Sequence, residues 1–218
     1  MMDIGNVLIG VVVALTLGLT GWFFIAAQWN ARRNHEALRW LRSGLPQVSE
    51  RTSMNWMGTT GVRLDMSEAK EPFKSVEVLT LMEPRDVVPL WILSHLRGRR
   101  DVMIVRGNLR RHARVEFDLI KAGSWSGKDV LRRGIPKEWT QATLSDGMLL
   151  ASEGPDATRS AQEIKARLAK LSPQLTRVSV RRTVPHIEMH LLSPWKGSQA
   201  SPDVMKLFKA VGELLLPS

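Results

Sequence analysis

An uncharged apolar segment near the N-terminus constrains this chain more than any other feature of its sequence. From Ile4 to Ala27 the chain runs for 24 residues without a charged side chain. As an α-helix rising ~1.5 Å per residue, the segment would be about 36 Å long, slightly more than the ~30 Å hydrocarbon core of a bilayer. Tilting of the helix absorbs the excess length. The segment therefore predicts a transmembrane anchor, placed in residues 1–30.

A cleaved signal peptide is the alternative interpretation of this segment. Signal peptides begin with a basic region, whereas the residues before Ile4 include Asp3 and neither lysine nor arginine. The apolar run is also longer than a usual signal-peptide core, and Ile25-Ala26-Ala27 makes a poor cleavage site. We therefore expect the anchor to be retained.

The flanking charges give the anchor a direction. Its C-terminal flank carries four arginines and its N-terminal flank carries none, and basic flanks tend to stay in the cytoplasm. We expect a single-pass protein of the cell (inner) membrane, with the N-terminus outside and the C-terminal domain in the cytoplasm. The four flanking residues, which are also candidates for binding anionic lipid or an acidic partner, are Arg32, Arg33, Arg39 and Arg42.

Small residues line one face of the anchor. Such a row lets a second membrane helix approach closely, from another membrane protein or from a second copy of this chain. The bland alternative is that glycine is simply common in membrane helices. The row comprises Gly10, Ala14, Gly18 and Gly21.

The basic juxtamembrane segment, residues 31–50, continues with helical spacing. Leu38, Leu41 and Leu45 form one apolar stripe, and Pro46 ends the pattern. Two interpretations are open. The helix could lie on anionic lipid headgroups, or it could pack against its own domain.

The remaining residues have the composition of a folded domain. Apolar residues make up 44% of the chain and charged residues 24%, which argues against disorder. The absence of cysteine excludes disulfides, thiolate catalysis and cysteine-based zinc sites. The net charge of +10 favours anionic partners but does not choose among lipid, nucleic acid and acidic protein.

Periodicity predicts an α+β fold for this domain. The expected helices are a segment capped by Asp86 and ending at Leu96, a short one near 128–133, one over 156–171 and one opened by Ser201-Pro202. An Asp146-Gly147 hairpin turn begins the second half. The expected strands are residues 52–57, 62–66, 76–82, 102–109, 113–121, 175–184 and 186–193.

The order of these elements predicts an internal duplication. Residues 51–136 and 137–218 each follow the pattern ββαββα, and Val115–Ile120 resembles Ile187–Leu192 at an offset of 72 residues. Trp125 and Trp195 are 70 residues apart. A near-constant offset is what a duplicated unit produces, although short apolar strands can also match by coincidence. If the duplication is real, a pseudo-twofold axis should relate the halves, with the same strand order in each.

The best candidate for chemistry is the segment His186-Ile187-Glu188-Met189-His190. Residues two apart share one face of a strand, so Glu188 together with either His186 or His190 could bind a metal in a membrane-bound, metal-dependent hydrolase. All three could not easily bind one ion, because the outer two are too far apart on an extended strand. The matching strand carries an ordinary polar face at these positions, which makes a plain sheet surface the stronger interpretation. We predict no catalytic residue, metal or cofactor.

Arginines also cluster around the turns of the domain, notably Arg99, Arg100, Arg110 and Arg111. In the duplicated arrangement these turns would form one basic end. Nucleic-acid binding would call for aromatic side chains among them, and there are none. Anionic lipid or an acidic partner is therefore the favoured target, with a solvated basic surface as the alternative.

These observations predict a non-enzymatic, membrane-anchored protein with a basic cytoplasmic domain. It would serve as an accessory subunit, scaffold or assembly factor of a membrane complex. The expected partners are anionic membrane lipids and other membrane proteins, or a second copy, through the anchor. The alternatives are the metal-dependent hydrolase and a membrane-tethered binder of nucleic acid or anionic lipid.

Overall fold

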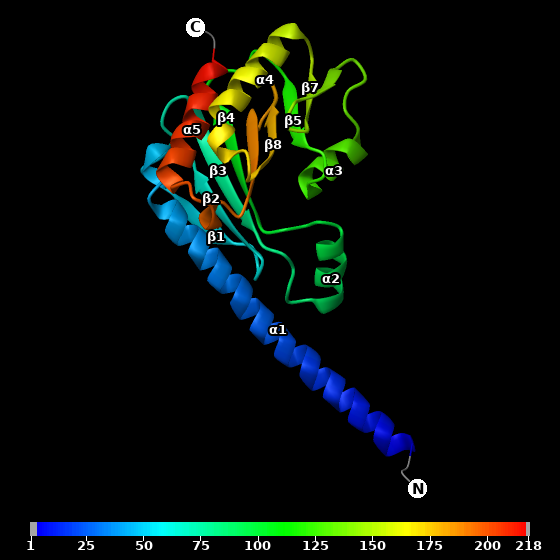
Figure 1. Ribbon diagram of the computed structural model, residues 1–218. Coiled ribbons are helices and arrows are strands. Elements are labelled where there is room, and N and C mark those ends of the chain that lie inside the picture. Colours follow the sequence, from blue (N-terminus) through cyan, green and yellow to red (C-terminus); the bar gives the residue numbers. More distant parts are fainter. Residues whose placement is uncertain (1–3, 217–218) are drawn as a thin grey trace.

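The computed structural model describes residues 4–216 and contains one long helix attached to an α+β domain (Figure 1). Asp3, on which part of the argument against a signal peptide depends, lies outside these residues. The helices are α1 (Ile4–Arg42), α2 (Val88–Leu96), α3 (Trp125–Arg133), α4 (Pro155–Arg167) and α5 (Ser201–Leu214).

The described residues form nine strands that pair into one antiparallel sheet, in the order β1-β2-β3-β4-β9-β8-β5-β7-β6. The expected hairpin joins β6 to β7, and Gly147 adopts the positive φ of 77° that this turn requires. The strands are β1 (Ser53–Trp56), β2 (Gly61–Met66), β3 (Phe73–Leu81), β4 (Val102–Leu109), β5 (Phe117–Lys121), β6 (Thr140–Thr143), β7 (Met148–Ser152), β8 (Leu175–Val180) and β9 (Ile187–Leu192).

The α+β fold class is therefore confirmed, and each half has the expected element order, with β1 preceding the first. The pseudo-twofold arrangement is not supported by the strand pairing. In the first half β3 pairs with β4, but its counterpart β7 pairs with β5 and not with β8. The halves also interleave, because β9 and β8 of the second half lie between β4 and β5 of the first. This order depends on pairing between strands that are far apart in the sequence. The alternation of apolar and polar residues along one strand does not show which strand it pairs with.

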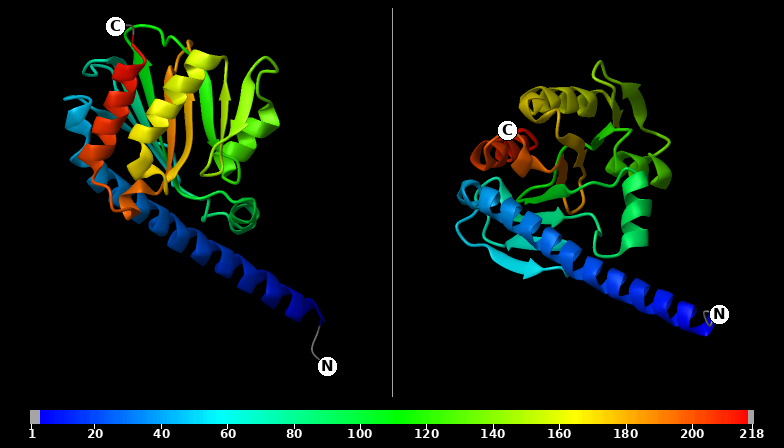
Figure 2. Two further views of the ribbon diagram at one scale, coloured as in Figure 1. Left: turned by 45° about the horizontal axis from the view of Figure 1, so that its top comes forward. Right: turned by 60° about the horizontal axis from the view of Figure 1, so that its bottom comes forward.

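The helices divide between the two faces of the sheet. The second half of α1, together with α5 and α4, covers one face and encloses the main core, in which Phe73 and Phe208 stack with ring centroids 4.9 Å apart (Figure 2). α3 packs on the opposite face, where the Ser126 hydroxyl donates to Thr176 Oγ1 at 3.1 Å. Helix α2 lies apart from the main core, beside α1 (Figure 1).

Two details of the predicted helices need correction. Helix α2 begins at Val88 after Val87 and not at an Asp86 cap, because the Asp86 carboxylate accepts a hydrogen bond from the Thr59 hydroxyl. The predicted helix over 156–171 ends at Arg167, and a short 3₁₀ turn, Ala169–Leu171, follows it.

Candidate functional site

Helix α1 changes character along its length without a break. Its first part is apolar and exposed, and among the described residues it is the one helix long and apolar enough to cross a membrane. Its second part enters the domain through a buried stripe spaced three or four residues apart, as one face of a helix requires. The stripe consists of Ala26, Asn30, Asn34, Ala37 and Leu41, each at most 1% exposed.

This stripe decides between the two interpretations of the juxtamembrane segment: the helix packs on its own domain. Leu41 is fully buried in the main core, and Leu38 and Leu45 pack against it. The predicted anchor and neck thus belong to one 39-residue helix. The apolar segment is therefore joined to the domain without a linker.

A buried ion cluster joins α1 to the sheet near the start of β4. Arg85 lies at its centre and forms a two-pronged ion pair with Asp101, with Nη1–Oδ1 and Nη2–Oδ2 distances of 2.9 and 3.2 Å. Its Nη2 also donates to Glu83 Oε1 at 3.2 Å, and its Nη1 donates to Asn30 Oδ1 of α1 at 3.1 Å. The Asn30 amide in turn donates to the Glu83 carbonyl oxygen. We call Asn30, Glu83, Arg85 and Asp101 the junction cluster.

Further side chains complete the junction cluster's hydrogen bonds. Trp91 Nε1 donates to Glu83 Oε2 at 3.0 Å, and His95 Nδ1 lies 2.8 Å from the same oxygen. Arg33 of α1 approaches Asp101 with an Nη1–Oδ2 distance of 3.8 Å. The Arg85 guanidinium also lies 5.5 Å from the ring centroid of Trp29. Two carboxylates are thus matched by two guanidinium groups, and both carboxylates have several donors.

The charged side chains of the junction cluster are buried, so their pairing must be accurate. The side chains of Arg85, Glu83 and Asp101 are only 8%, 5% and 4% exposed. Buried charges lose their hydration, so they are tolerated only when paired with good geometry, and removing one partner is strongly destabilising. Because α1 supplies Asn30, the cluster is complete only when α1 is docked. The junction cluster therefore ties α1 to the domain at Asn30.

The junction extends into the apolar segment itself. Trp22 Nε1 donates to the Arg85 carbonyl oxygen at 2.7 Å, and the Trp22 ring stacks on Trp91 of α2 with centroids 5.7 Å apart. Trp22 lies before Ala27, so cleavage after Ala27 would remove both contacts.

Glu188, the central residue of the candidate metal site, belongs to a row of ion pairs on the face of the sheet opposite to α5. We call this row the ion ladder. Glu188 Oε2 accepts from Arg106 Nε at 2.6 Å, and Glu188 Oε1 accepts from Arg177 at 3.3 Å and lies 2.7 Å from His190 Nε2. The ion ladder crosses six strands and comprises Asp65, Arg63, Glu77, Arg106, Glu188, Arg177 and Asp118.

The electrostatics of Glu188 follow from these contacts. Burial alone would raise the pKa of this carboxyl group, but the hydrogen bond and charge of His190, followed by those of Arg106, lower its pKa to about 2. The charge of this carboxylate is thus already matched by Arg106 and Arg177, which disfavours a metal ion beside it. His186 does not join it, because His186 Nδ1 accepts from the Leu109 amide at 3.0 Å. No group of three or more His, Asp or Glu side chains placed to hold a metal occurs in residues 4–216.

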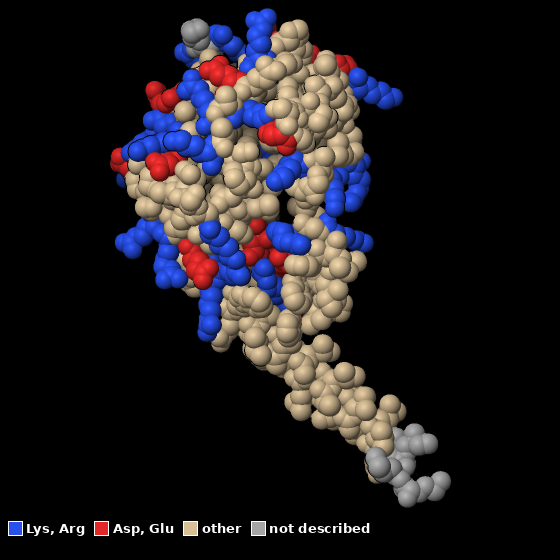
Figure 3. All heavy atoms as spheres, in the orientation of Figure 1, with Lys and Arg blue, Asp and Glu red and all other residues tan. Residues whose placement is uncertain are grey.

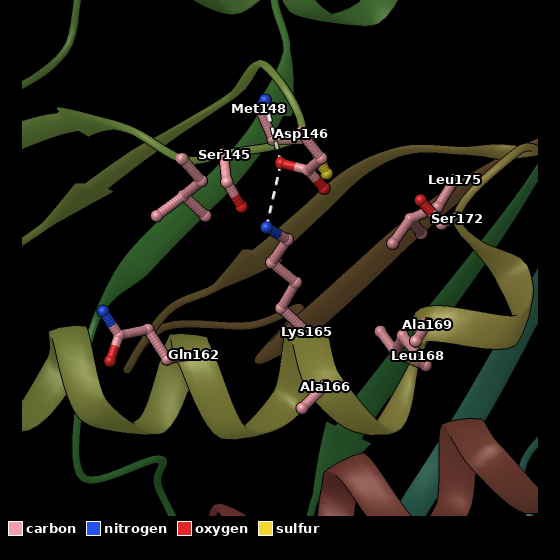
Figure 4. A pocket seen from close by; sticks show the side chains of 11 residues that line it. Ser145, Asp146, Met148, Gln162, Lys165, Ala166, Leu168, Ala169, Ser172 and Leu175 are labelled. Carbon is pink, nitrogen blue, oxygen red and sulfur yellow. Dashed lines mark hydrogen bonds and ion pairs between the residues drawn. The ribbon is translucent and has the colours of Figure 1, made fainter.

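A pocket lies between α4 and the β6–β7 hairpin (Figure 4). Its walls are mainly apolar, and its charged groups, Lys165 and Asp146, pair with each other at 2.8 Å. Asp146 Oδ1 also accepts from the Met148 amide. Burial alone would raise the pKa of Asp146, but the hydrogen bond from Lys165 and its charge lower the pKa. The pair therefore secures the hairpin and leaves no unpaired charge among the residues that line the pocket.

The predicted basic positions fall in separate places and do not form one basic end. Arg99 and Arg100 precede β4, whereas Arg110 and Arg111 follow it, which places the two pairs at opposite ends of that strand. On α1, Arg32, Arg39 and Arg42 are exposed, and Arg33 turns towards Asp101. Figure 3 shows basic side chains spread over the domain surface in that view, and the outer part of α1 without them.

The small residues of the anchor lie in its exposed part. A methyl group added at Gly10, Gly18 or Gly21 would meet no atom within 4 Å. Ala14 is likewise exposed. The face is therefore open to a neighbouring helix, and its use as a helix contact stays a prediction.

Sequence reasoning missed the junction cluster. One signal was present: Ala26, Asn30, Asn34 and Ala37 continue a helical stripe through a segment that is otherwise basic. Asparagines on the inner stripe of a helix need buried partners. Nothing in the sequence indicated that these partners would be Glu83, Arg85 and Thr80.

Comparison with known proteins adds no family to this description. No protein-family model matches the chain, and no curated protein matches it significantly in sequence.

Proposed function

We propose that this protein is a non-enzymatic, single-pass membrane protein that holds its α+β domain in a fixed orientation against the membrane. It would act as an accessory subunit, scaffold or assembly factor of a membrane complex. The observation that carries the proposal is the continuity of α1, whose second half is part of the domain core while its first half is apolar and exposed.

Retention of the anchor is supported by the junction. A cleavable signal sequence makes no contribution to the mature fold, whereas Trp22 and Ala26 contribute here: Trp22 hydrogen-bonds to Arg85, and Ala26 is 1% exposed. Arg85 is itself the centre of a buried ion cluster. Loss of the apolar segment would therefore remove these contacts and expose domain residues that they cover.

The proposed orientation places the N-terminus outside and the domain in the cytoplasm of the cell. Arg32, Arg39 and Arg42 are exposed on the domain side of the apolar segment, which agrees with retention of a basic flank in the cytoplasm. A rigid connection suits an accessory role, because a protein that presents a surface to a membrane partner benefits from fixed geometry. The open row of Gly10, Ala14, Gly18 and Gly21 would supply the contact with that partner's helix.

The test is the size and composition of the particle that carries this chain in native membranes. The full chain should resist extraction by alkaline carbonate, and intact mass should include the apolar segment. After mild detergent extraction it should migrate with one or more further membrane proteins or as an oligomer. The Gly18→Ile variant should weaken that association, while Leu17→Ile, one position away, serves as a matched control.

Three results would contradict different parts of the proposal. Recovery as a lone monomer under mild extraction would remove the accessory role. A mature chain that lacks residues before Gln28 would remove the anchor. Protease added to the outside of spheroplasts should leave the domain intact, and digestion there would reverse the orientation.

A further inference from the structure

Helix α2 exposes an apolar surface that the domain does not cover. Its inner side, with Trp91 and Ser94, faces the rest of the protein, and Trp91 bonds to the junction cluster. A water-soluble domain rarely exposes so many apolar side chains on one short helix. The outward residues, between 45% and 78% exposed, are Val87, Leu90, Ile92, Leu93 and Leu96.

The position of α2 relative to the anchor is fixed by contacts on both helices. The Trp22–Trp91 stack joins the middle of α2 to the apolar segment, and an apolar groove runs between the two helices. Leu19 and Phe23 of α1 form one wall of this groove, and Val87 and Pro89 form the other. The outer surface of α2 is therefore continuous with the exposed surface of the anchor (Figures 1 and 3).

The level of this contact along α1 corresponds to the edge of a bilayer. Trp22 precedes Ala27, the last residue of the apolar segment, by five positions, or about 7.5 Å along a helix. A segment of about 36 Å centred on a ~30 Å core leaves about 3 Å at each end, so Trp22 would lie just inside the hydrocarbon boundary. This depth adjoins the membrane–water interface, where tryptophan is enriched.

Basic side chains border α2 on the side towards the domain. Arg97 and Arg100 follow its last turn, and the Arg99 guanidinium lies 5.5 Å from the ring centroid of Trp125 on α3. Arg97 also lines a pocket with Lys128, Arg132 and the acidic Asp129 of α3. An apolar helix face with cations directly behind it matches the layering of acyl chains and anionic headgroups.

We propose that α2 is a second membrane contact, which lies in the interface of the same bilayer that the anchor crosses. Its outward residues would enter the boundary between acyl chains and headgroups, an acyl chain would fill the groove beside Leu19 and Phe23, and the adjacent arginines would bind anionic headgroups. This inference rests on the proposed anchoring. Together the two contacts would prevent the domain from turning about the anchor.

Lipid is favoured over a protein partner as the occupant of this face. The face adjoins the exposed surface of the anchor through a groove with mainly apolar walls, in which the one charged group, Asp86, accepts a hydrogen bond from Thr59. The cations beside the face lie on the domain side. A protein partner would need no such alignment with the apolar segment.

The natural absence of cysteine allows a clean test, because a single introduced cysteine can be labelled with an environment-sensitive NBD fluorophore.

The test compares three labelled variants of the full chain, Leu93→Cys, Val12→Cys and Val184→Cys, in vesicles of phosphatidylcholine with a minority of phosphatidylglycerol. Val12 lies in the anchor, and Val184, which is 69% exposed, lies in the β8–β9 turn. Nitroxide groups are placed on the lipid acyl chains at a shallow or a deep position. The label at Leu93 should be quenched severalfold more by shallow than by deep nitroxide, with the reverse at Val12 and no quenching at Val184.

Each other outcome has a definite meaning. Quenching at Val12 without quenching or blue-shifted emission at Leu93 would place α2 in water and overturn this inference while leaving the anchor intact. Blue-shifted but unquenched emission at Leu93 would mean that protein covers α2, which also overturns it. Absence of quenching at Val12 would overturn the proposed anchoring itself.

Discussion

Removing the charge of Arg85 should destabilise the domain far more than removing an arginine from its surface. Arg85→Met keeps most of the side-chain volume but deletes four hydrogen bonds, two to Asp101, one to Glu83 and one to Asn30. Two buried carboxylates then face the single guanidinium of Arg33, whose Nη1 lies 3.8 Å from Asp101 Oδ2. Breaking a buried ion pair from one side costs about 3–5 kcal/mol, so we expect a loss of that size.

The assay is urea denaturation of the full chain in dodecyl maltoside micelles, followed by circular dichroism and tryptophan fluorescence. The matched control is Arg51→Met, whose ion pair with Glu68 is exposed on both sides and should contribute little. The double variant Arg85→Met, Asp101→Leu should recover part of the loss, because it removes one unpaired carboxylate. A loss below about 1 kcal/mol for Arg85→Met would refute the view that the junction cluster is a buried, mutually dependent unit.

Three further predictions concern pH and packing. Because the folded-state pKa of Glu188 is about 2, below its ordinary 4.5, its contribution to stability is complete above pH 4.5 and should be lost as pH falls towards 2; pH titration of unfolding should show a smaller loss in Glu188→Gln. Burial, followed by the charge of His112, lowers the pKa of His186, so stability should also fall as pH drops below 6.5, and this component should vanish in His186→Gln. Gly127→Ala would place a methyl group against the Lys121 carbonyl oxygen and should cost about 1–3 kcal/mol in urea denaturation, whereas Gly123→Ala enters open space and should not.

Local features of the fold were predictable because they depend on neighbouring residues. The 102–109 strand has its predicted bounds, and the Asp146-Gly147 turn joins β6 to β7 as expected. The predicted strand over 113–121 begins only at Phe117, because an alternating pattern does not show where pairing starts. The apolar segment was recognisable because a run of this length has few other structural solutions.

The strand order and the junction cluster were out of reach for a different reason. Which strand pairs with β4 depends on contacts between residues far apart in the chain, and β9 occupies that place. Asn30, Arg85 and Asp101 look like ordinary surface residues in the sequence, and only tertiary packing buries them. The same limit applies to Glu188, whose histidine neighbours in the sequence are typical of a metal site, whereas its partners Arg106 and Arg177 come from other strands.

The most direct test of the central claim is the distance distribution between α1 and the domain. Spin labels on Leu15→Cys in the anchor and Leu131→Cys on α3, measured by double electron–electron resonance in lipid nanodiscs, report whether the two parts move as one body. A rigid junction predicts a single narrow distance, which broadens when Arg85→Met is added. A broad distribution in the otherwise unchanged chain would show that the anchor is a flexible tether and would contradict the account.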